Sequence, residues 1–94
     1  MLAVGAHLDT VFPEATDVRV KREGTRLMAP GVGDDTRGLP LLLALVRAME
    51  AAKVETDADI LFVGSVGEEG EGDPRGVKYL LQSGKYKSRI QRFV

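Results

Sequence analysis

The feature that most constrains the fold is the nearly continuous apolar run at residues 58–66. A run of this length predicts a strand covered on both faces, as in parallel sheets flanked by helices. Leu2–Ala6 is a shorter apolar run and predicts a buried strand that ends in a loop at His7. Helices are expected from about Thr36 to Ala52 and from Arg75 to Gln82. This alternation of strands and helices predicts an α/β fold with a mixed, mainly parallel sheet.

The connecting segments give two further expectations. Val18–Lys21 alternates with period two and predicts a hairpin with Arg26–Met28, through a turn at Glu23–Gly24. The first helix is apolar almost all the way round, which is typical of a helix covered on several sides. We expect Pro40 to be tolerated because it falls in the first turn of that helix.

The C-terminal third predicts a pair of helices. The helix at Arg75–Gln82 would direct three apolar side chains inward, namely Val77, Leu80 and Leu81. Gly84 then provides a plausible C-cap. The segment Tyr86–Val94 predicts a second short helix, with Ile90 and Phe93 directed inward.

Size and charge narrow the classes of function. A chain of 94 residues has room for one domain, and we treat residues 1–94 as a single unit. The formal net charge of −1 creates no field that would attract nucleic acid or a membrane surface. The N-terminus lacks the basic lead of a signal peptide, and no apolar run approaches the roughly 20 residues of a membrane span. We therefore expect a cytoplasmic protein, and the absence of cysteine excludes thiolate metal sites.

The first group of potential metal ligands is His7 and Asp9, at the end of the first predicted strand. They lie two positions apart, so extended backbone directs both side chains to one face. A carboxylate there can accept a hydrogen bond from the second nitrogen of a metal-bound imidazole. A surface histidine beside a loop-capping aspartate is the simpler interpretation of the pair alone. His7 is the single histidine of the chain.

The second group is Asp34 and Asp35, which follow the glycine-rich segment Gly31–Gly33. Glycines allow the backbone to approach a ligand closely. A carboxylate held there can bridge two cations about 3.5–4 Å apart, as in two-metal hydrolases. Aspartate before an apolar helix also commonly caps it. One of the two residues could bind metal while the other caps the helix.

The third group is Glu68 and Glu69, which follow the second predicted strand. Adjacent carboxylates repel each other unless a cation or a shared proton relieves them. One could bind a metal and the other could act as general base. The alternative is a solvated acidic turn, because Glu71 and Asp73 continue the acidic run. All three groups lie in loops, where open α/β sheets bind ligands, and they offer imidazole and carboxylate ligands that suit Zn²⁺, Mn²⁺ or Co²⁺.

Taken in order, the segments at residues 5–11, 30–35 and 66–70 resemble the motifs of the co-catalytic dizinc metallopeptidase family. This family includes peptidase T, glutamate carboxypeptidase, acetylornithine deacetylase and the aminoacylases. Residues 75–80 and 84–87 also resemble the segment after the family's paired glutamates. The resemblance covers nearly the whole chain. It implies a partial zinc-exopeptidase sandwich of the phosphorylase/hydrolase-like type.

The resemblance implies a role for each matching residue. His7 would bind one metal, and the carboxylate of Asp9 would orient its imidazole. Asp34 would bridge two metals, and Glu69 would bind the second. Glu68 would be the general base.

The position of the bridging aspartate leaves an alternative. The family often has a lysine two residues after the bridging aspartate, and with Asp34 as the bridge this position holds Thr36. A match shifted by one residue would make Asp35 the bridge and pair it with Arg37. Asp34 is preferred because residues 30–33 then align without a gap. The resemblance also implies a cis peptide bond after the bridging residue.

The implied activity is zinc-dependent hydrolysis of small peptides or N-acyl amino acids, with Co²⁺ or Mn²⁺ as substitutes. Two further ligands of the family's site, an acidic residue and a second histidine, have no match. We therefore expect a partial catalytic domain that is inactive or weakly active alone. The apolar helix predicts a homo-oligomer. The competing interpretation is a non-catalytic oligomeric α/β module with a vestigial metal site.

Overall fold

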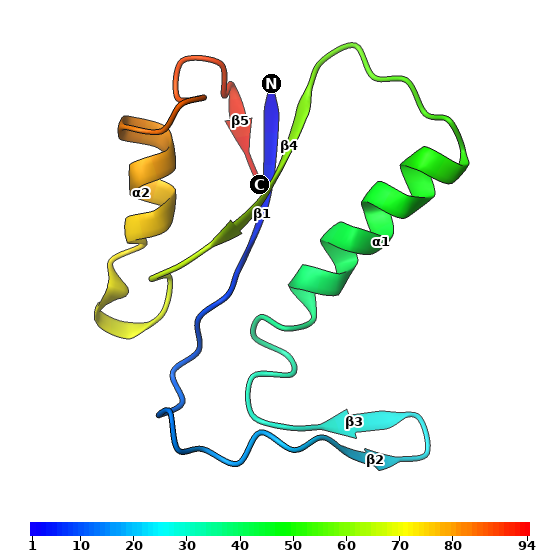
Figure 1. Cartoon of the computed structure of the whole chain (residues 1–94), viewed down its shortest axis with the longest axis vertical. Helices are drawn as coiled ribbons and strands as arrows, with labels where there is room; N and C mark the ends of the chain where they lie inside the picture. Colours follow the sequence, from blue (N-terminus) through cyan, green and yellow to red (C-terminus); the bar gives the residue numbers. More distant parts are fainter.

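The computed structural model describes residues 1–94 and is organised around a three-stranded parallel sheet (Figure 1). The strand order is β4-β1-β5, and the strands are β1 (Leu2–His7), β4 (Ile60–Ser65) and β5 (Arg92–Phe93). The register of β1 with β4 runs from Leu2 opposite Ile60 to His7 opposite Ser65. The carboxyl ends of β1 and β4 therefore lie at the same edge of the sheet. The predicted α/β class is confirmed, and all three strands of this sheet are parallel.

Helix α1 (Gly38–Ala51) lies on one side of the sheet and α2 (Arg75–Gln82) on the other (Figure 1). The partly buried apolar side chains of α1 recur every three or four positions and are Leu39, Leu42, Val46 and Met49. By contrast, Leu41 and Leu43 are 67% and 62% exposed. The expectation that α1 is covered on several sides is therefore wrong within this chain, because only the sheet covers it.

The second helix has the predicted bounds, with one difference in its buried face. Val77 and Leu80 are partly buried, whereas Leu81 is exposed. The first two are three positions apart and share a face, while Leu81 is turned about 100° from Leu80. Neither α1 nor α2 is long and apolar enough to cross a membrane.

The predicted hairpin is shorter than expected. Its strands are β2 (Lys21–Glu23) and β3 (Arg26–Met28), joined at Gly24, which has a positive φ of 59°. Residues 18–20 are not part of a strand. Their partners would lie beyond Met28, where Ala29–Pro30 ends the second strand. The hairpin lies away from the parallel sheet (Figure 1).

The predicted helix at Tyr86–Val94 is wrong, because this segment forms a turn followed by β5. The backbone of Gly5 donates to the carbonyl of Val94, and Val94 donates to the carbonyl of Ala3, at 2.8 and 2.9 Å. Pairing with the open edge of β1 thus overrides a weak helical pattern. The ring of Phe93 packs over Gly5, where a Cβ would lie only 2.9 Å from its Cζ.

The interior of the chain is small. Ala3 and Ala6 of β1 are its buried apolar side chains. The radius of gyration is 15.7 Å, which exceeds the roughly 13 Å of a compact 100-residue domain. Much apolar surface is therefore exposed to solvent.

Candidate metal centre

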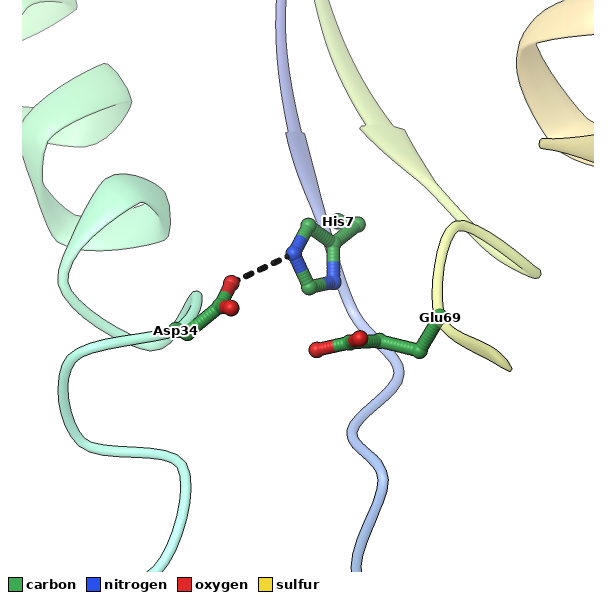
Figure 2. Close-up of side chains that lie close together, drawn as sticks. All are labelled: His7, Asp34 and Glu69. Carbon is green, nitrogen blue, oxygen red and sulfur yellow. Dashed lines mark hydrogen bonds and ion pairs between the residues drawn. The ribbon is translucent and has the colours of Figure 1, made fainter.

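The structure brings His7, Asp34 and Glu69 together from three separate segments (Figure 2). His7 is the last residue of β1, Asp34 precedes α1, and Glu69 follows β4. One ligand atom from each residue lies within 4.8 Å of the other two. Such convergence follows from the parallel register of β1 and β4, which places the loops after both strands at one edge.

The His7 imidazole is held at both nitrogens. Its Nδ1 donates to the backbone carbonyl of Asp9 at 2.9 Å, and its Nε2 lies 2.8 Å from Oδ1 of Asp34. Burial lowers the pKa of His7, but the Asp9 carbonyl, the Asp34 carboxylate and the charge of Glu68 outweigh this effect and raise it overall. The environment of Nε2 therefore favours positive charge, and a metal ion could replace the proton there.

The carboxylate of Asp9 lies near the His7 imidazole but has other hydrogen-bond partners. This carboxylate lies 3.8 Å from Nδ1 of His7, so the carbonyl of Asp9, and not its carboxylate, accepts the imidazole hydrogen bond. The carboxylate instead accepts the backbone N–H groups of Glu69 at 3.0 Å and Glu68 at 3.3 Å. These bonds, with that from Glu69 the stronger, lower the pKa of Asp9. Asp9 therefore fixes the backbone at Glu68 and Glu69, the segment called the glutamate loop.

The two glutamates differ in their surroundings. The pKa of Glu69 is raised by burial and by the negative charges of Asp34 and Glu68, which outweigh the attraction of His7. Glu68 is more exposed, and its Oε2 lies 3.7 Å from Nε2 of His7. A cation among these carboxylates would relieve their repulsion. Glu68 is close enough to act on a group bound there.

The two aspartates before α1 divide the two tasks considered for them. Asp34 directs its side chain to His7, as Figure 2 shows. The carboxylate of Asp35 accepts backbone N–H groups of His7 and Gly38. Asp35 is therefore not directed at the candidate centre and contacts the start of α1. The peptide bond between Asp34 and Asp35 is cis, as the resemblance implies.

The donor set suits a divalent cation. One imidazole and two carboxylates are ligands that Zn²⁺, Co²⁺ and Mn²⁺ accept. Catalytic zinc usually has three protein ligands and one open position. The contacts of Asp9 with the N–H groups of Glu68 and Glu69, and of Asp35 with that of His7, had no sequence signal, because any acceptor at the right place can bind an N–H group.

Comparison with known proteins gives a family for this arrangement. The model described as peptidase family M20/M25/M40 matches residues 3–94. No curated protein matches the chain. Members of the matching family are hydrolases and are typically metal-dependent.

Proposed function

The chain belongs to peptidase family M20/M25/M40, and from this premise we propose that it is a zinc-dependent hydrolase unit for peptide or N-acyl amide bonds. The observation that carries the proposal is the convergence of His7, Asp34 and Glu69 within 4.8 Å. These three residues would hold the metal, with Asp34 as the residue shared by two ions. Co²⁺ or Mn²⁺ would be accepted in place of zinc.

Glu68 would carry out the proton transfers. When bound, zinc would supply Lewis acidity, which polarises the scissile carbonyl and acidifies water. The Glu68 carboxylate, 3.7 Å from Nε2 of His7, would take a proton from that water and return it to the leaving amine. Asp9 would keep Glu68 and Glu69 in place through its two backbone hydrogen bonds.

Small peptides and N-acyl amino acids are the proposed substrates, as the resemblance implies. The chain has one histidine, so a second metal would lack an imidazole ligand from this sequence. With Asp34 shared between two ions, each ion would have two of the three protein ligands that catalytic zinc usually has, and we expect weak binding. We therefore expect weak turnover or none from the 94-residue chain alone.

Metal titration and a Glu68→Gln variant test the proposal. The chain should take up Zn²⁺, and any turnover should fall by about 10²–10⁴-fold in Glu68→Gln while zinc remains bound. Glu71→Gln is the matched control, because Glu71 is exposed in the same loop and lies outside the cluster. Persistent turnover in Glu68→Gln would remove Glu68 as the base. A chain that takes up no zinc, cobalt or manganese would leave the non-catalytic module as the better interpretation.

Exposed apolar side chains support a second proposal, self-association of the chain. Leu41 and Leu45 lie four positions apart on one face of α1 and are 67% and 41% exposed. Exposed apolar patches commonly mark association surfaces. Light scattering should detect dimers or larger species, and Leu41→Glu should reduce them. A strictly monomeric native chain would contradict this proposal.

A further inference from the structure

The carboxylate of Asp35 joins two elements that carry the candidate metal ligands. Its Oδ2 accepts the backbone N–H of His7 at 3.2 Å, and its Oδ1 accepts the backbone N–H of Gly38 at 3.1 Å. His7 ends β1, and Gly38 begins α1. A single side chain therefore links the end of the central strand to the start of the helix.

The backbone N–H of His7 has no neighbouring strand as its partner. Leu2 and Leu8 donate to Asp59 and Ser65 on the β4 side, so the even-numbered N–H groups of β1 are directed to β4. Gly5 donates to Val94 on the opposite side. His7 is directed to that same side, but β5 pairs only with Leu2 and Ala3. Asp35 thus supplies the acceptor that a longer strand would have offered.

The surroundings of Asp35 leave its carboxylate little freedom. A Cβ added at Gly38 would collide with it, so the absence of a side chain at Gly38 allows the carboxylate to approach the helix. The N–H of Gly38 is also bonded to the backbone carbonyl of Asp35 at 2.8 Å. His7, in contrast, has the Asp35 carboxylate as its acceptor. The link to His7 is therefore the contact that the side chain alone provides.

We propose that Asp35 is a positioning residue of the candidate metal centre, which fixes the backbone of His7 relative to Asp34. Asp34 precedes Asp35 directly, and its Oδ1 lies 2.8 Å from Nε2 of His7. The same loop thus contacts His7 twice, through the imidazole and through the backbone. This inference rests on the proposed metal-binding function and assigns the role to a residue that contacts neither metal nor substrate.

The test compares Asp35→Ala with the native 94-residue chain. Alanine removes both acceptor oxygens, so the His7 N–H loses its partner, whereas the Gly38 N–H keeps the backbone carbonyl of Asp35. We expect Co²⁺ affinity, followed by visible absorption, to fall by about 10–100-fold, the usual cost of losing a group that supports a ligand. In the metal-free chain, hydrogen exchange of the His7 amide should become at least about tenfold faster, because an unbonded amide is less protected.

Two further variants separate positioning from general stability. Gly38→Ala retains the carboxylate but displaces it, and should lower Co²⁺ affinity although alanine favours helices. Ala48→Gly weakens α1 at an exposed position far along the helix, and should leave Co²⁺ affinity and His7 exchange unchanged. Gly38→Ala also provides the answer if Asp35→Ala does not fold.

The metal-binding function and the positioning role of Asp35 can fail separately. Equal Co²⁺ affinity in Asp35→Ala and the native chain would overturn the positioning role. The role would also be overturned if Ala48→Gly lost as much affinity as Asp35→Ala. If the native chain binds no metal, the proposed function fails. In that case His7 exchange tests only the structural link: faster exchange in Asp35→Ala would show that Asp35 fixes the His7 backbone, and unchanged exchange would overturn that link as well.

Discussion

The carboxyl edge of the parallel sheet and the hairpin-bearing segment at residues 10–33 both contain charged side chains, but they use them differently. At the sheet edge, four side-chain hydrogen bonds join residues 27 to 60 positions apart, among them His7–Asp34 and Asp9–Glu69, beside the local His7–Asp9 and Asp35–Gly38 bonds. In the hairpin-bearing segment they join residues two apart, as in Asp17–Arg19 and Arg22–Gly24. Long-range bonds fix loops relative to each other, whereas the local ones shape only their own turn.

Bond geometry alone would rank the two regions in the opposite order. Arg19 donates to both oxygens of Asp17, with Nη2 at 2.7 Å and Nε at 3.0 Å. Yet both side chains are exposed, and exposed ion pairs contribute little to stability. The His7 side chain is only 10% exposed, but its partner Asp34 is 77% exposed, so water reaches this contact from the Asp34 side. Sequence separation, and not bond length, distinguishes the candidate site.

The largest expected effect comes from removing a ligand at the sheet edge. Glu69→Ala should lower Zn²⁺ affinity by more than about 100-fold, which exceeds the cost of losing a supporting group. It should also abolish the rise in unfolding temperature that zinc gives the native chain, because a ligand that binds only the folded state stabilises it. Calorimetric titration and thermal unfolding measure the two effects. An equal zinc-induced rise in Glu69→Ala would contradict the assignment of Glu69 as a ligand.

An intermediate effect is expected for Asp9→Asn. This change weakens the acceptor of the Glu68 and Glu69 N–H groups, and Zn²⁺ affinity should fall by about 10–100-fold. Hydrogen exchange of the Glu69 amide should become faster. Asp73→Asn is the control, because Asp73 is exposed nearby and pairs with Lys78. If the two variants bind zinc equally well, the bonds of Asp9 do not support the glutamate loop.

The smallest effect is expected in the hairpin-bearing segment. Asp17→Asn removes the charge that pairs with Arg19, but the pair is exposed and local. Zinc affinity should change by less than about twofold, and the unfolding temperature should be unchanged. A loss comparable to that of Asp9→Asn would show that this segment is coupled to the site, and the contrast between the two regions would fail.

The sequence predicted those parts of the fold that depend on local pattern. The apolar runs predicted β1 and β4. The polar residues where these runs end pointed to His7, Glu68 and Glu69 as candidate site residues. The C-terminal strand was missed because β5 has only two residues and exists through pairing with β1. No local pattern marks such a strand.

The candidate site, like the fold, was predictable only in part. Motif resemblance selected Asp34, and the structure places it beside His7. A helix-capping aspartate before α1 was predicted, and Asp35 accepts the N–H of Gly38. The contacts of Asp9 with Glu69 and of Asp35 with His7 were not predicted, because these carboxylates bind backbone N–H groups of distant segments. Any residue can supply such an N–H group, so the pairing has no signature in residue type.

The unequal lengths of β4 and β5 have a mechanical consequence for the molecule. β1 has a neighbouring strand on both sides at its beginning, but only β4 accompanies it to His7. Thermal fraying should therefore start at the end that carries the candidate ligands. Order there depends in part on the backbone N–H groups that Asp9 accepts from Glu68 and Glu69. These bonds lower the pKa of Asp9, so acid that protonates Asp9 would weaken them. A cation bound by His7, Asp34 and Glu69 would crosslink three segments at the end of the sheet that has the fewest strand neighbours.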